Sequence, residues 1–185
     1  MNLKHLLVTG ILAVALLSCG EDPVPKPKAM LRLEYPAQAY RSMQSDCPFT
    51  FDYNRMAVPD LSEGCSMILD YKPMKGSIYL TYKPVEGNLR ELLADAQKLS
   101  YEHVVKADNI LEQPYVNKQD RVFGMFYEVK GDAASQSQFY VTDSLNHFVT
   151  GSLYFYAKPN YDSIFPAAIY LQKDIRRIVE TLRWQ

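Results

Sequence analysis

The sequence predicts an α+β domain in which two main helices pack on an antiparallel β-sheet. Three observations predict this class: short β-runs stand before and after one amphipathic helix, turn residues join successive β-runs, and a second long apolar periodicity ends the chain. The regular strand–helix alternation of a doubly wound parallel sheet is absent. We therefore expect a single α+β domain over residues 30–185.

The first half of this domain supplies four predicted strands and one helix. The strands are expected at 30–35, 48–53, 66–71 and 77–82. Asn88 and Glu91 form a capping-box pattern, which predicts that a helix begins after Asn88. An apolar stripe continues that helix to about Val105 through Leu89, Leu92, Leu93, Ala96 and Leu99. Pro114 is expected to close the segment that follows.

The second half predicts a three-strand meander and a long helix. The strands are expected at 122–130, 138–142 and 148–156, with turns at 131–135 and 143–146. The last helix is expected to start near Asp162, with Pro166 in its first turn, where a missing N–H is tolerated. A meander followed by such a helix is similar to the PsbP/Mog1-like sandwich.

The N-terminus has the pattern of an exported lipoprotein. Lys4 precedes a twelve-residue apolar stretch, 6–17, which is shorter than the roughly 20 residues that span a membrane as a helix. Cys19 follows in a lipobox-like run, so we expect lipidation there, a signal peptide at 1–18 and a Pro-rich tether at 19–29. The alternative is a general secretory signal with a chance cysteine.

Export places the remaining cysteines in an oxidising compartment. Cys47 and Cys65 are an even pair there, which favours a disulfide; the alternative is two free, buried thiols.

Composition argues against several functional classes. A net charge of −1 offers no basic surface for nucleic acid, and with 8 glycines no phosphate-binding loop motif occurs. No spacing typical of metal ligands is present, and His103 is interpreted as an ordinary helix residue. We expect no cofactor, no metal and no catalytic residues.

Two regions are candidate surfaces. Asp143, Ser144 and His147 have the residue types of a catalytic triad, but one tight turn cannot easily build that relay, and Asp and Ser at a turn commonly bond their own backbone. We interpret the turn as an exposed interface. Trp184, the single tryptophan, is expected to plug the core at the end of the last helix. An aromatic sheet surface around 154–156 is the alternative, as a ligand or glycan platform.

Many segments of the chain resemble the gliding-motility lipoprotein GldD family of Bacteroidota. They are 47–53, 80–83, 106–108, 131–135, 138–144, 147–148, 151–155, 159–160, 162–163, 174–175 and 178–184. The chain departs from the family pattern at Ser66, where an aromatic residue is expected, and in a shortened stretch around Tyr35.

The resemblance implies a cell-envelope lipoprotein required for gliding motility and type IX secretion. It implies a non-enzymatic role in assembling or stabilising other envelope components of that machinery, so the working surface is expected to be a protein interface. The alternative function is an envelope lipoprotein that binds a small ligand or glycan through its aromatic sheet surface.

Overall fold

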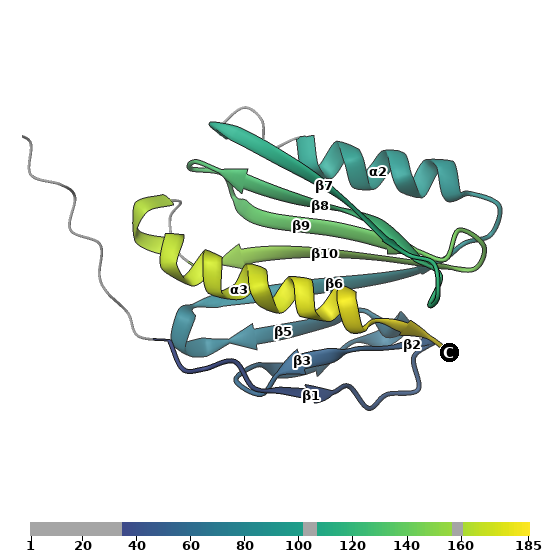
Figure 1. Cartoon of the computed structure of the whole chain (residues 1–185), viewed down its shortest axis with the longest axis horizontal. Coiled ribbons are helices and arrows are strands. Elements are labelled where there is room, and N and C mark those ends of the chain that lie inside the picture. Colours follow the sequence, from purple (N-terminus) through teal and green to yellow (C-terminus); the bar gives the residue numbers. More distant parts are fainter. Residues whose placement is uncertain (1–34, 102–106, 157–160) are drawn as a thin grey trace, which may run out of the picture.

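The computed structural model describes residues 35–101, 107–156 and 161–185, and at its centre lies a seven-stranded antiparallel sheet (Figure 1). Its strands lie in the order β4-β5-β6-β10-β9-β8-β7. They are β4 (Val58–Leu61), β5 (Met67–Tyr71), β6 (Gly76–Pro84), β7 (Asn109–Asn117), β8 (Val122–Lys130), β9 (Ser135–Thr142) and β10 (His147–Phe155). The predicted α+β class is confirmed, whereas the PsbP/Mog1-like similarity stays a prediction.

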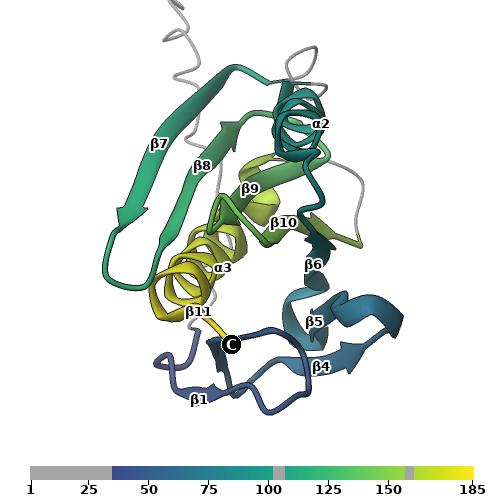
Figure 2. The ribbon, with the colours of Figure 1, turned by 90° about the vertical axis from the view of Figure 1, so that its right-hand side faces the viewer.

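Helices α2 (Leu89–Tyr101) and α3 (Tyr161–Thr181) cover opposite faces of this sheet (Figure 2). Successive residues of a strand point to opposite faces, and β10 shows the division. Phe148 packs in a cluster with Leu92 and Ala96 of α2. Its neighbour Val149 belongs to the main core, together with the buried face of α3. Among the described residues, no helix is long and apolar enough to cross a membrane.

Short elements complete the α3 side of the sheet. β1 (Tyr40–Ser42) pairs with β3 (Asp52–Asn54), and β2 (Phe49–Thr50) pairs with β11 (Arg183–Trp184). Two 3-10 turns, η1 (Glu63–Cys65) and η2 (Lys72–Met74), flank β5. The predicted strand at 48–53 is therefore interrupted at Phe51, because its two halves pair with different partners.

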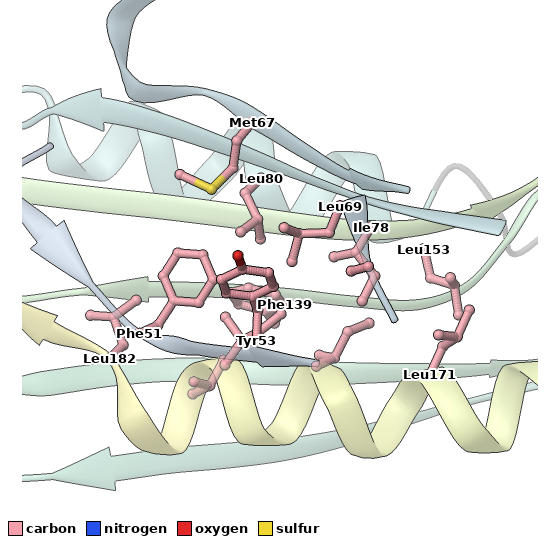
Figure 3. Close-up of a cluster of buried hydrophobic side chains, with 14 of the residues drawn as sticks. Phe51, Tyr53, Met67, Leu69, Ile78, Leu80, Phe139, Leu153, Leu171 and Leu182 are labelled. Atoms are coloured by element: carbon pink, nitrogen blue, oxygen red, sulfur yellow. The ribbon is translucent and has the colours of Figure 1, made fainter. Parts of the chain in front are cut away.

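The main core lies between α3 and the sheet. Side chains from β3, β5, β6, β9, β10 and α3 converge there (Figure 3), among them Phe51, Tyr53, Leu69, Ile78, Phe139, Leu153 and Leu171. Leu69, Ile78, Leu153 and Leu171 have no exposed surface. This single layer accounts for the apolar periodicity of the last helix, whose buried positions recur every three or four residues.

The residue pattern did not predict β1, β4, β7 or β11. Pro114 does not close a segment; it lies inside β7, which forms one edge of the sheet. An edge strand has no neighbour on one side, so a proline there need not interrupt the sheet. The expected positions at 30–34 and 102–106 lie outside the described residues, as do Cys19 and the tether.

Candidate functional site

A cleft of about 350 Å³ lies at the end of the sheet where the C-terminus emerges (Figure 1). The strand register aligns Val116, Phe123, Thr142 and Phe148 across β7, β8, β9 and β10, so the β7–β8 and β9–β10 turns lie at the same end. The third wall is β11. These segments contribute the lining residues Gln119, Asp120, Arg121, Asp143, His147, Arg183 and Trp184.

The carboxylate of Asp143 organises the β9–β10 turn. One of its oxygens accepts hydrogen bonds from the backbone N–H groups of Leu145, Asn146 and His147 at 3.0, 2.8 and 2.8 Å. Burial by itself would raise the pKa of Asp143, but these donors together outweigh burial and hold the pKa below its usual 3.8. Ser144 adopts a left-handed conformation with φ of 69°, which lets the chain reverse.

The three residues predicted to form an interface differ in how far they are exposed. Asp143 is only 6% exposed, so the expectation that it lies at the surface is wrong: its carboxylate is the internal acceptor of the turn. Ser144 is exposed and His147 is half-buried. Leu145 at the tip is 57% exposed. The outward surface of the turn is therefore formed by Ser144, Leu145, Asn146 and part of His147.

His147 and Trp184 stack against each other on the cleft wall. Their ring centroids are 5.1 Å apart and their planes differ by 14°. Nδ1 of His147 lies 3.0 Å from the hydroxyl of Tyr82. The indole N–H of Trp184 donates to the backbone carbonyl of Arg121 at 3.1 Å, which joins β11 to the β7–β8 turn. Two regions that were singled out separately in the sequence thus share one surface.

Trp184 was predicted to plug the core, but it does not do so. The helix α3 ends at Thr181, and the chain continues as β11 beside β2. Trp184 is half-buried there and makes a T-shaped contact with the buried ring of Phe49 at a centroid distance of 6.4 Å. It therefore forms part of the rim, and one portion of the indole is available in the cleft.

The charged groups of the cleft differ in how many of their hydrogen-bonding positions are already used by neighbouring residues. Nε of Arg183 lies 3.0 Å from the carboxylate of Asp120, which also accepts a 2.7 Å hydrogen bond from Asn117. Arg121 is exposed and donates one long hydrogen bond, 3.4 Å, to the backbone carbonyl of Asp143. Within the described ranges, no carboxylate lies at ion-pair distance from Arg121. Its guanidinium therefore keeps unused donors.

A family model described as gliding motility lipoprotein GldD matches residues 20–184. The chain belongs to the GldD family. The match spans nearly the whole sequence and includes every element that builds the cleft. A search of the curated proteins found no match. The resemblance noted in the sequence is thereby confirmed, and membership in GldD implies a role in gliding motility.

The cleft of this GldD-family protein does not build a triad from Asp143, Ser144 and His147. The Asp143 carboxylate accepts from backbone N–H groups, and Nδ1 of His147 faces the Tyr82 hydroxyl, so neither orients the other as a relay requires. Across 35–101, 107–156 and 161–185, no group of three or more His, Cys, Asp or Glu residues could hold a metal ion.

Neither cysteine of the predicted pair lines the cleft of this GldD-family protein. Cys47 and Cys65 form a disulfide in the structure, with Cα atoms 5.5 Å apart. That separation is within the range that a disulfide requires. Oxidation of the pair in the exported protein stays a prediction, which a thiol assay addresses below.

The aromatic residues near the end of β10 do not form a flat platform in this GldD-family protein. Tyr154 meets Tyr79 of β6 edge to face, with planes 80° apart. The Tyr156 hydroxyl lies 2.6 Å from the hydroxyl oxygen of Ser77.

Sequence reasoning missed a buried polar network around Asp174, which is 1% exposed on α3. Its carboxylate accepts hydrogen bonds from Gln38 and Tyr40, each at 2.9 Å, and from Asn54 at 3.0 Å. Burial raises the pKa of Asp174, against the opposing effect of these donors. The network fixes the first described segment of this GldD-family protein on α3, where Tyr35 also packs against Tyr170.

Proposed function

We propose that this GldD-family lipoprotein is a non-enzymatic assembly or stabilising component of the gliding and type IX secretion machinery. The observation that carries the proposal is the convergence of Trp184, His147 and Arg121 with the exposed Leu145 at one end of the domain. Tryptophan and arginine are enriched among the residues that dominate binding energy at protein interfaces. Other envelope proteins of the machinery are the proposed partners, and nucleic acid is not.

The cleft is well suited to docking because its parts are rigidly held. The Asp143 carboxylate fixes the turn through three backbone hydrogen bonds, and the Trp184 indole N–H fixes β11 to the neighbouring turn. A surface that is ordered before binding loses less conformational entropy when a partner docks.

The proposed anchor is an acylated Cys19, carrying palmitate or a similar chain, that holds the protein to a membrane of the cell envelope after the signal peptide is removed. The start of the first described segment, purple in Figure 1, and the C-terminus lie at opposite ends of the long axis. Tyr35 of that segment packs on Tyr170, in the N-terminal half of α3.

A charge placed on the exposed tip of the turn tests the docking role. Leu145→Glu adds a charge beside the cleft, whereas Leu61→Glu adds the same charge to a similarly exposed leucine on the edge strand β4. The exposed fractions are 57% and 51%, so the two variants are matched. We expect both to fold, and only Leu145→Glu to abolish colony spreading, protein secretion and cross-linked recovery of envelope partners.

The result that contradicts the docking role is full spreading, secretion and partner recovery with Leu145→Glu. Equal loss in both variants would show that any added surface charge is harmful, and it would equally remove the support for the cleft. Circular dichroism of both purified variants controls for folding.

The anchor is tested separately with Cys19→Ala. We expect the variant to leave the membrane fraction while the domain keeps the circular dichroism spectrum of the wild type. Its recovery in membranes after a carbonate wash would contradict lipidation at Cys19.

A further inference from the structure

The geometry points to a partner chemistry for the cleft: we propose that it binds an acidic peptide segment of a partner protein, with a carboxylate on Arg121 and a neighbouring apolar side chain against Trp184. This inference rests on the proposed docking function and specifies its ligand. It concerns the described residues alone and needs no cofactor.

The charge of the ligand follows from which groups in the cleft are already engaged. The Asp120 carboxylate is paired with Arg183 at 3.0 Å, and the buried Asp143 accepts hydrogen bonds from three backbone N–H groups of its own turn. Arg121, in contrast, is exposed and makes one 3.4 Å hydrogen bond. A guanidinium with unused donors can bind a carboxylate through two parallel hydrogen bonds.

The main chain of Arg121, from which the cation extends, is held in place at the cleft wall. Its φ of 55° lies in the left-handed region, an unusual conformation for arginine. Its carbonyl accepts the indole N–H of Trp184 at 3.1 Å. The indole is thus bonded to the same residue that carries the cation, so a ligand in the cleft can contact both.

The size and surroundings favour a peptide over a small anion. A cleft of about 350 Å³ is large enough for more than a single carboxylate group. Exposed aliphatic side chains lie at the same end of the sheet, with Leu145 57% and Val116 61% exposed. A peptide with apolar residues beside its acidic one would cover both, whereas inorganic phosphate would leave them in water.

The single tryptophan makes the cleft directly observable, because intrinsic tryptophan fluorescence comes only from Trp184. The full-length lipoprotein in detergent micelles would be titrated with short peptides that alternate Glu and Leu, and with the same peptides in which Gln replaces Glu. We expect a saturable change in emission with the acidic peptide alone, weakened when the salt concentration rises from about 50 mM to about 500 mM.

Three variants test whether the positive charge of Arg121 binds the acidic peptide. Arg121→Gln is expected to weaken acidic-peptide binding at least about tenfold, the loss typical for a hydrogen bond to a charged group. Arg121→Lys keeps the charge and should retain part of the affinity. Arg90→Gln removes an exposed arginine from α2, on the opposite face of the sheet, and should bind as the wild type does.

The outcomes separate this inference from the docking role. Equal binding of the acidic and Gln peptides, or unchanged affinity in Arg121→Gln, overturns the acidic-peptide proposal. An equal emission change with inorganic phosphate alone overturns it in favour of a small anion, and concentration-dependent self-association of the protein without peptide overturns it in favour of a second copy. If these tests fail while Leu145→Glu still abolishes partner recovery, the docking function stands and only the ligand chemistry is wrong.

Discussion

Replacing Asp143 by alanine should destabilise the domain, since this carboxylate holds the β9–β10 turn from inside. The change removes the acceptor of three backbone N–H groups at 2.8–3.0 Å. A hydrogen bond to a charged group contributes about 1.5–3 kcal/mol when its donor cannot regain water. Leu145 and Asn146 are exposed, so their N–H groups can regain water, whereas His147 is half-buried.

The two exposed donors are counted at the level of helix N-cap hydrogen bonds. Together, the three contributions give an expected loss of about 3 kcal/mol in the free energy of unfolding. For a domain of this size the loss corresponds to a fall in Tm of about 6–12 °C. Urea and thermal denaturation followed by far-ultraviolet circular dichroism measure it. Ser144→Ala, at the next and exposed position, is the matched control and should change stability by less than about 0.5 kcal/mol.

The pH dependence gives a second measurement of the same turn. The pKa of Asp143 is lowered in the folded protein from its usual 3.8, so its charge contributes stability that is present above that value. The contribution is lost as the pH falls through the lowered pKa. Asp143→Asn keeps the acceptor without the charge, so the advantage of the wild type over this variant should shrink as the pH falls below about 4. A loss below about 1 kcal/mol in Asp143→Ala at neutral pH would refute the reasoning.

Three further predictions concern other parts of the fold. Gly124→Ala places a Cβ 1.9 Å from the carbonyl oxygen of Tyr140, so β8 and β9 must separate locally; we expect a loss of about 3 kcal/mol by denaturation, and a stable variant would contradict this contact. Replacing Cys47 and Cys65 together by serine opens a disulfide of sequence separation 18 and should cost about 3 kcal/mol. Complete alkylation of both thiols in the unreduced, unfolded wild type would exclude the bridge. Burial raises the pKa of Asp174 from 3.8, so the unfolded chain loses this proton before the folded protein does, and stability falls as the pH rises from about 4 through the raised value. Asp174→Asn should flatten this slope in denaturation series at several pH values, and an unchanged slope would show that another group causes it.

The elements that bury a regular apolar face could be predicted from the sequence. The range expected for β8, 122–130, agrees with the structure, because its aromatic and β-branched residues pack between two neighbouring strands. The start of α3 was predicted to within two residues. In both cases burial in the fold imposes a periodicity that is visible in the residues themselves.

The edges of the sheet could not be predicted in this way. β7 has a neighbour on one side only, and most of its residues are exposed, so it shows no apolar alternation, and Pro114 disguises it further. Missing β7 also hid the β7–β8 turn, and with it the role of Arg121. The contribution of Arg121 to the cleft depends on register between strands, which no local pattern records.

Asp174 is a different case, since a signal for it was present. It lies three residues after Leu171 and one before Ile175, on the face of the helix that the apolar pattern buries. A carboxylate at such a position requires several donors, and the sequence does not show that they come from Gln38, Tyr40 and Asn54, more than a hundred residues away.

The same residues that close the end of the fold also shape the proposed interface, so a variant there can lose motility through instability or through lost binding. Asp143 and the backbone of Arg121 serve stability, since the first holds a turn and the second binds the Trp184 indole N–H. The Leu145 side chain and the Arg121 guanidinium project from these supports, and their exposure means that changing them should leave the free energy of unfolding nearly unchanged. Loss of motility from Asp143→Ala would therefore report instability, whereas loss from Leu145→Glu at wild-type stability would report binding. Because the groups that support the fold differ from the side chains that contact the partner, the docking role can be tested separately from stability.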